Sequence, residues 1–242
     1  MFVGHLAVGL AGKRFATRTS LGTLFVAAQL PDVLWSLLLL TGVEHARIVP
    51  GITAASPLDL YDFPISHSLL MDVVWGALFA LGNWLVRRYT RGACVLGLAV
   101  VSHWVLDWLS HRPDMPLAPR LMGRYGAGVW NSIPLTLVVE GGIWLLGLVI
   151  YLRATKPRDR LGSYGFWPAI VLLTGIWIAS VGGPPPPNIR VVALGNVASL
   201  AVFAWAYWID THRPAVAARP PSQAIISSRS RPSSARSMGT SE

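Results

Sequence analysis

The chain has 242 residues, of which 53% are hydrophobic and only 13% are charged, and its net charge is +9. Soluble domains average about 25% charged residues, so this composition excludes an ordinary soluble domain and indicates an integral membrane protein. The 11 Trp residues fit that interpretation, because Trp is enriched at membrane interfaces. The single cysteine excludes an internal disulfide and a cysteine-based zinc site.

Six stretches are apolar and close to the ~20 residues that a helix needs to cross a bilayer. They are residues 21–43, 67–86, 92–111, 133–152, 164–182 and 191–208. Residues 1–12 are apolar but too short to span, and they either dip into the bilayer or lie against the other helices. We therefore expect an all-α fold: a polytopic helical membrane bundle with about six transmembrane helices plus a short N-terminal helix.

Basic residues gather before the first span, between the second and third, between the fourth and fifth, and after the sixth. The positive-inside rule then places both ends of the six-span unit in the cytoplasm. We expect a multi-pass protein of the inner (plasma) membrane. Residues 1–210 form the predicted membrane domain. Residues 211–242 are rich in Ser, Pro and Arg, which predicts a disordered cytoplasmic tail. We expect membrane lipid as a partner and no nucleic acid, since the chain carries no nucleic-acid-binding motif.

Three ionisable residues lie one helical turn apart within the apolar stretch 92–111: His103, Asp107 and His111. Spacing of i, i+4 and i+8 places them on one face of a helix. Imidazole and carboxylate are the usual ligands of zinc and similar ions. The alternative is a buried polar ladder that holds helices together, but ionisable groups in an apolar span by default mark a functional site.

The other spans add only a few ionisable residues, and none of them is Lys or Arg. The complete set is Asp32, His67, Asp72, His103, Asp107, His111 and Glu140, with His5 in the N-terminal segment. Acids that served only as salt-bridge partners would be accompanied by Lys or Arg. A set of histidines and acids alone requires another positive charge, which metal cations or protons supply.

Each of these residues also has a structural alternative. Asp32 follows a proline and could cap a broken helix. His67 could be an interfacial residue at a helix start, and His5 a polar residue at a frayed end. Asp72 is expected to pair with another span or to face a water cavity. For Glu140, a role as ligand or general base and a role as a buried protonated acid are equally open.

Four short motifs follow one another in the first half of the chain. They are Gly-His-Leu-Ala at 4–7, Leu-Pro-Asp at 30–32, Ser-His-Ser-Leu-Leu at 66–70 and Ser-His-Trp-Val-Leu-Asp at 102–107. In this order they resemble the membrane-bound metal-dependent hydrolase family of the LexA-regulated type (domain of unknown function 457). The resemblance covers about residues 1–119. It implies a helical inner-membrane protein with a metal-dependent hydrolase site.

More distantly, this order of histidines and acids is similar to that of the zinc phospholipase C and single-strand nuclease group. Those all-helical enzymes hydrolyse phosphoesters with clustered zinc ions. The similarity implies the metal ligands His5, Asp32, His67, His103, Asp107 and His111. The group carries a further His-x-x-x-Glu, which this chain lacks. We therefore expect one or two divalent ions, with zinc as the metal.

The leading hypothesis is a membrane-embedded metal-dependent hydrolase that acts on a phosphoester, with a lipid as the most accessible substrate. Asp32 would bridge two ions or act as general base, and Glu140 is a second candidate base. The alternatives are an ion- or metal-handling transporter and a non-catalytic membrane assembly protein, both using the same His/Asp cluster.

Overall fold

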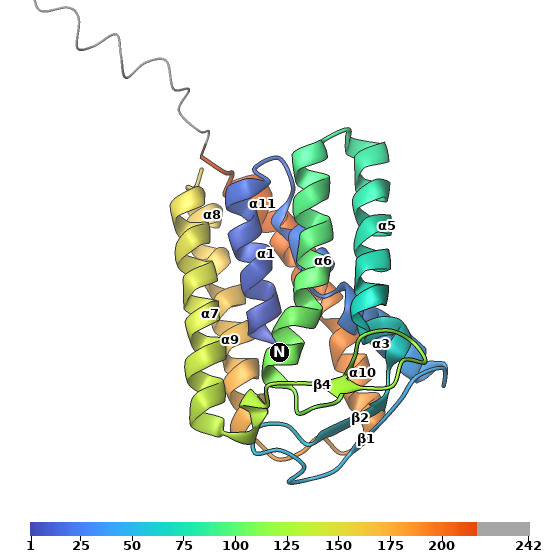
Figure 1. The fold of residues 1–242 in the computed structure, drawn as a ribbon. Coiled ribbons are helices and arrows are strands. Elements are labelled where there is room, and N and C mark those ends of the chain that lie inside the picture. The colour runs from blue at the N-terminus through green and yellow to red at the C-terminus, as the bar shows by residue number, and fades with distance from the viewer. Residues whose placement is uncertain (217–242) are drawn as a thin grey trace, which may run out of the picture.

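The computed structural model describes residues 1–216 as a bundle of helices standing side by side (Figure 1). The predicted helical membrane bundle is confirmed. Within the described residues, 5 segments are long and apolar enough to cross a membrane, and a bent pair of helices makes up to 6. The five are Leu69–Arg87, Thr90–Ser110, Ile133–Ala154, Arg160–Gly182 and Ile189–His212.

Helix α1 (Val3–Phe15) is short yet lies in the interior of the bundle, where it packs against α2, α6, α7 and α9. It is built mainly of Gly, Ala, Val and Leu, and a helix that is apolar on all sides is normally buried. Leu6 and Leu10 are almost completely covered. Gly147 of α7 lies directly on the backbone of Ala7, because a Cβ at this glycine would lie 2.6 Å from the Ala7 carbonyl oxygen. The N-terminal segment is thus a central packing element.

The first predicted span is broken into α2 (Leu21–Ala28) and α3 (Leu30–Leu40), which meet at an angle of 57°. Pro31 lies in the first turn of α3, where its missing N–H leaves no helical hydrogen bond unmade. The break at Gln29 puts Asp32 in that first turn. The carbonyl of Ala28, at the end of α2, is left without a helical partner of its own and becomes available to other groups.

Helix α4 (Pro64–His67) is one short turn, and α5 (Leu69–Arg87) starts immediately after it because Ser68 caps its first turn by accepting the Met71 N–H. Helix α6 (Thr90–Ser110) then runs antiparallel beside α5. Gly76 lets the two backbones approach closely, since a Cβ there would lie 2.9 Å from the Gly97 carbonyl oxygen. His111 is the C-cap of α6 and has extended backbone, so the predicted three-residue helix face ends one residue earlier than expected.

The helices of the second half of the chain pack against α1, α2 and α3. Its helices are α7 (Ile133–Ala154), α8 (Arg160–Tyr164), α9 (Phe166–Gly182), α10 (Ile189–Ala198) and α11 (Leu200–His212). Beyond α11, the Val216 N–H donates to the Ala154 carbonyl oxygen, and Ala215 pairs with Thr155. The predicted tail boundary at 211 therefore falls within the described residues. The remainder of that predicted tail, 217–242, lies outside them.

The loops at one end of the bundle form two small antiparallel sheets that the sequence did not predict. They pair β1 (His45–Ile48) with β2 (Leu58–Asp62), and β3 (Met115–Pro116) with β4 (Arg124–Tyr125), and a 3₁₀ turn η1 (Val129–Asn131) follows. We call this end, where β1–β4 lie, the loop end (Figure 1). The opposite end carries the C-termini of α1, α5, α7 and α11, and we call it the basic end after its arginines.

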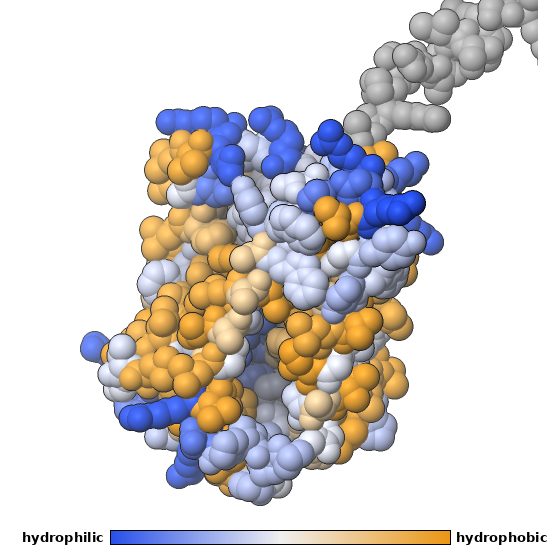
Figure 2. Space-filling model, turned by 180° about the vertical axis from the view of Figure 1, so that it is seen from behind, coloured by the Kyte–Doolittle hydropathy of each residue, from blue (hydrophilic) through white to orange (hydrophobic). Residues whose placement is uncertain are grey.

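The surface between these two ends is largely apolar. Large side chains such as Leu78, Leu98, Val138 and Val171 are exposed on four different helices. Figure 2 shows apolar surface over much of the molecule and hydrophilic groups at both ends, most of them at the basic end. Side chains this apolar are stable in contact with acyl chains rather than water, so the bundle contacts lipid along its length.

Candidate metal centre

The histidines and acids predicted as metal ligands come together in one buried cluster. They come from separate elements: His5 from α1, Asp32 from α3, His67 from the end of α4, and His103 and Asp107 from α6, with His111 just after α6. His103 has no exposed surface, and the other histidines and Asp107 are at most 3% exposed. We call these six residues the His/Asp cluster. It lies toward the loop end, where α6 finishes.

Asp107 is the hub of the His/Asp cluster. Its Oδ1 lies 3.0 Å from Nε2 of His5, and its Oδ2 lies 3.3 Å from Nε2 of His103. The same Oδ2 is 3.7 Å from Nε2 of His67 and 3.8 Å from Nε2 of His111. A single carboxylate is therefore approached by imidazole nitrogens from α1, α4 and α6 and from the residue after α6.

Asp32 is the second acid of the cluster. Its Oδ1 lies 3.4 Å from Nε2 of His67 and 3.8 Å from Nε2 of His103. Its side chain is 23% exposed, whereas that of Asp107 is 3% exposed. The two acids thus share the imidazoles of His67 and His103, and Asp32 is the one that can be reached from outside.

Two overlapping triads have the spacing of metal ligands. In the first, His5, His103 and Asp107 offer ligand atoms that all lie within 4.8 Å of one another. In the second, Asp32, His67 and His103 do the same. Ligands bound to zinc at about 2.0–2.2 Å lie within this distance of each other, so each triad could hold an ion.

A hydrogen bond at Nδ1 of His103 orients the imidazole ring relative to the two acids. Its Nδ1 lies 2.8 Å from the carbonyl oxygen of Ala28 at the break between α2 and α3. A carbonyl oxygen only accepts, so Nδ1 carries the hydrogen. In the neutral ring, Nε2 then presents a bare lone pair toward Asp32 and Asp107, and it has no hydrogen-bond partner among the described residues. This is the arrangement of a metal-ligating histidine.

His67 is oriented by a short relay that starts outside the cluster. The Ser66 hydroxyl donates to Glu44 Oε2 at 2.5 Å, and its oxygen lies 2.7 Å from Nδ1 of His67. Because the serine hydrogen is directed at Glu44, the His67 Nδ1 must be the donor to Ser66. Glu44 is buried and also accepts the Ile65 and Ser66 N–H groups. The relay leaves Nε2 of His67 free to face Asp32 and Asp107.

The His111 ring is also oriented through its Nδ1, and the partner is Asp114. Its Nδ1 lies 3.0 Å from Asp114 Oδ1, which can only accept from the imidazole when ionised. Asp114 is in turn held by the Arg112 side chain, whose Nε lies 3.2 Å from Oδ2. Nε2 of His111 therefore faces Asp107. Three of the four imidazoles are thus locked at Nδ1 and present Nε2 to the acids.

The start of α1 also reaches the cluster. The Met1 amino group contacts Asp107 Oδ1 and lies 3.4 Å from Ser110 Oγ. Glu140 Oε1 accepts the Phe2 N–H at 2.5 Å and the Gly4 N–H at 3.2 Å, and Oε2 accepts the Trp177 indole N–H at 3.0 Å. Glu140 therefore anchors the first turn of α1, next to His5. Its predicted role as a base stays a prediction.

Asp72 is buried in α5, and neither of its carboxylate oxygens has a hydrogen-bond partner among the described residues. The sequence predicted that it pairs with another span or faces water. The structure gives it no partner side chain within the described part of the chain, and it stands outside both candidate triads.

Comparison with known proteins agrees with a membrane bundle. The profile of the YdjM inner membrane protein family matches residues 1–184, which is most of the chain and includes the whole His/Asp cluster. The chain belongs to the YdjM inner membrane protein family. This is an inner-membrane family, and its description names neither a metal nor a reaction. The resemblance to metal-dependent hydrolases is consistent with it. No curated protein and no solved structure matches the chain significantly.

The sequence did not identify the outer partners that orient the ligands. Ser66 was part of a recognised motif, but its bond to Glu44 depends on a loop that folds back over α4. Glu44 and Asp114 lie outside the predicted spans. The signal that could have found Asp114 is its position three residues after His111. No local sequence pattern predicts the bond between His103 and the Ala28 carbonyl oxygen, because this oxygen is accessible only where the helix breaks.

Proposed function

We propose that this YdjM-family protein is a membrane-embedded, metal-dependent hydrolase of phosphoesters, and that its substrate is a membrane lipid. The observation that carries the proposal is the common orientation of His67, His103 and His111. Each donates its Nδ1 hydrogen to an outer acceptor and turns Nε2 toward Asp107. Bare imidazole lone pairs facing carboxylates repel unless a cation lies between them.

The donor set favours zinc. Imidazole nitrogens with carboxylate oxygens suit Zn²⁺, whereas Mg²⁺ and Ca²⁺ prefer sites built from oxygen. His5, His103 and Asp107 would hold one ion, and Asp32 and His67 with the shared His103 would hold it from the other side or hold a second. When bound, such an ion supplies Lewis-acid chemistry: it polarises a phosphoryl oxygen and acidifies water.

The protein's own residues then have distinct tasks. Asp107 is buried and surrounded by imidazoles, so it serves as a fixed ligand. Asp32 is the more exposed acid, and we assign it the base that takes a proton from the attacking water. Glu140 holds the first turn of α1 and thereby places His5. The apolar surface around the bundle makes lipids the substrates that meet this site at the highest concentration.

One observation favours a second candidate, a non-catalytic membrane protein. The Met1 amino group already supplies a positive charge to Asp107, and protonated imidazoles could supply the rest. A transporter has less support, because α1 places the fully buried Leu6 and Leu10 between the cluster and the basic end. A transport pathway needs polar groups across the membrane.

The test uses the full chain purified in detergent. Wild-type protein should contain zinc by elemental analysis and hydrolyse bis(4-nitrophenyl) phosphate, while His103→Ala should lose both. Asp32→Asn keeps the shape of the side chain, and it should retain its fold by circular dichroism but lose most of the activity. The matched control is His45→Ala, because His45 is an exposed histidine paired with Asp62 outside the cluster. Wild-type levels of zinc and activity in His103→Ala would refute the proposal.

A further inference from the structure

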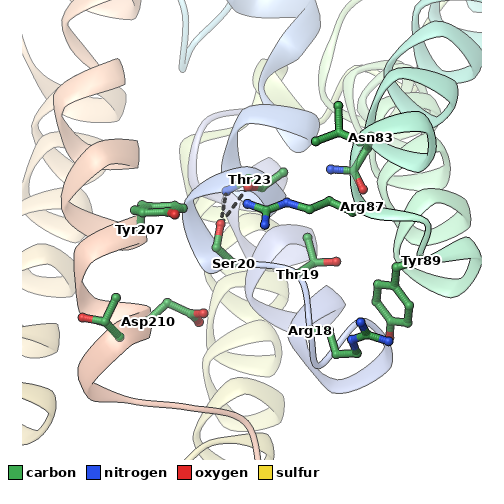
Figure 3. A pocket seen from close by; sticks show the side chains of 11 residues that line it. Arg18, Thr19, Ser20, Thr23, Asn83, Arg87, Tyr89, Tyr207 and Asp210 are labelled. Carbon is green, nitrogen blue, oxygen red and sulfur yellow. Dashed lines mark hydrogen bonds between the residues drawn. The ribbon is translucent and has the colours of Figure 1, made fainter.

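A second polar hollow lies at the basic end, away from the His/Asp cluster. It has a volume of about 470 Å³ and is formed by the α1–α2 loop, the last turn of α5 and the last turn of α11 (Figure 3). Arg18 borders it from the loop, Asn83 and Arg87 from α5, and Tyr207 from α11. We call it the basic pocket. None of its lining residues belongs to the metal centre.

The basic pocket has an excess of positive charge. Arg18 and Arg87 are both exposed, and neither forms an ion pair with any residue that the structure describes. Arg18 is held in place by stacking over the ring of Tyr89, with its Cζ 5.0 Å from the ring centre. The acid that lines the pocket, Asp210, is already bound to the Lys13 ammonium. The two guanidinium groups are thus available to an anion, and guanidinium binds phosphate well through paired hydrogen bonds.

Uncharged polar groups also line the pocket. Ser20 caps α2 by accepting the Thr23 N–H at 3.1 Å, and its hydroxyl lies 2.7 Å from the Thr23 hydroxyl. The amide of Asn83 points into the same space from α5 (Figure 3). Hydroxyl and amide groups of this kind bind the oxygens of a phosphate and of its glycerol ester.

An apolar groove continues from the basic pocket along the membrane-facing surface. It has a volume of about 330 Å³ and is lined by Val26 of α2, Phe79 of α5, and Phe203 and Ala204 of α11. Thr23 and Tyr207 line both hollows, so the groove and the pocket adjoin.

We propose that the basic pocket and the adjoining groove bind one anionic phospholipid. Its phosphate lies between Arg18 and Arg87, and one acyl chain lies in the groove between α2, α5 and α11. A free phosphate compound would use the pocket alone, and a neutral lipid would use the groove alone. The joined hollows fit a molecule that carries both parts. Such a lipid would tie the α1–α2 loop to α5 and α11. The proposal does not depend on the hydrolase function.

The test measures lipid binding to the detergent-purified full chain by native mass spectrometry. The probes are phosphatidylglycerol, phosphatidylcholine with the same acyl chains, and inorganic phosphate. Wild-type protein should bind phosphatidylglycerol more tightly than phosphatidylcholine, and inorganic phosphate should compete weakly. Arg18→Gln with Arg87→Gln should reduce phosphatidylglycerol binding by about tenfold or more, because each basic residue near an anionic headgroup accounts for roughly fivefold in affinity.

Two matched controls separate this site from general lipid contact. Arg158→Gln with Arg160→Gln removes two exposed arginines that do not line the pocket, and it should leave the preference intact. Ala204→Trp fills the groove and should weaken phosphatidylglycerol binding, whereas Ala201→Trp, on an exposed part of the same helix outside the groove, should not.

Three results would overturn the proposal. One is equal binding of both lipids by wild-type protein. Another is equal loss of binding in the two double-arginine variants. The third is full inhibition by inorganic phosphate together with an Ala204→Trp variant that behaves as wild type, which would assign the pocket to a free phosphate compound. None of these results bears on zinc content, so the proposed metal centre is tested independently of the lipid site.

Discussion

Acids with largely covered side chains occur at both ends of this bundle, but their partners differ. Toward the basic end, Asp210 faces the ammonium of Lys13, which also donates to the Thr19 carbonyl oxygen at 2.8 Å. Toward the loop end, Asp107 and Asp32 face imidazoles, and those of His67, His103 and His111 donate their Nδ1 hydrogens to other groups. Asp210 is paired with a lysine, whereas among the described residues no Lys or Arg pairs with Asp107 or Asp32, and Asp107 contacts only the Met1 amino group as a fixed cation.

The difference separates a structural ion pair from a binding site. A lysine locked onto an acid holds two helices together and has no capacity for a ligand. Imidazoles with oriented lone pairs leave the cluster dependent on protons, on the Met1 amine or on a metal. Natural proteins keep such unfavourable arrangements where function requires them. The following experiments test whether the two ends differ in this way.

The largest loss of stability is expected from Lys13→Met. It leaves Asp210 without its cation, and breaking a pair whose lysine is buried and whose acid is 17% exposed should cost about 2–3 kcal/mol, toward the low end of the range for buried pairs. Thermal unfolding in detergent measures it, with the exposed Lys156→Met as control. A loss no greater than that of the control would mean that the pair at the basic end is not structural.

Zinc should stabilise the wild-type protein more than the Asp32→Asn variant. At zinc concentrations of about 100 times the dissociation constant, ligand binding adds roughly 2.7 kcal/mol. In chelator-treated protein, the same substitution should change stability by only about 0.5 kcal/mol, because it removes no fixed cation contact. Melting curves with and without zinc test both parts. An equal stabilisation by zinc in the two proteins would show that Asp32 is not a ligand of the metal site.

Ser66→Ala should weaken zinc binding without abolishing it. The variant breaks the relay from Glu44 to His67, and loss of such an outer partner typically reduces metal affinity about 10–100-fold. Competition with a chromophoric chelator gives the affinity. Ser68→Ala is the control, because it removes a helix cap and leaves His67 untouched. Identical affinities in the two variants would contradict the relay.

The smallest effect is expected at Asp159, which is at the surface of the basic end. The His212 Nδ1 donates to Oδ2 at 2.7 Å and the Gly162 N–H donates to Oδ1 at 2.8 Å, and these bonds hold the pKa of Asp159 below its usual range. A depressed pKa stabilises the fold above the unfolded-state value of about 3.9, and that stabilisation is lost as the pH falls through the folded value.

Asp159→Asn keeps the cap but removes the charge. The variant should be slightly less stable than wild type near pH 7, and the difference should vanish as the pH falls below about 4. Urea unfolding at a series of pH values measures this. A difference that stays constant with pH would show that the charge contributes nothing.

The sequence predicted the parts of the fold that depend on local composition. Apolar stretches located the spans, and His103 and Asp107 pointed to the site because charges in lipid are costly. It could not place α1 at the centre of the bundle, since that position depends on close contacts such as Gly147 against Ala7. Nor could it show that Ser66 and Ala28 orient the imidazoles. Those bonds join segments far apart in the chain, and only the folded geometry creates them.

The central claim is that imidazoles from α1, α4 and α6 share a metal ion with Asp107. X-ray absorption spectroscopy of the purified full chain loaded with zinc tests it most directly. The account predicts nitrogen and oxygen ligands at about 2.0–2.2 Å, including at least two imidazoles. It also predicts that this signal disappears in Asp107→Asn. A protein that binds no zinc, or zinc whose shell shows no imidazole, would contradict the account.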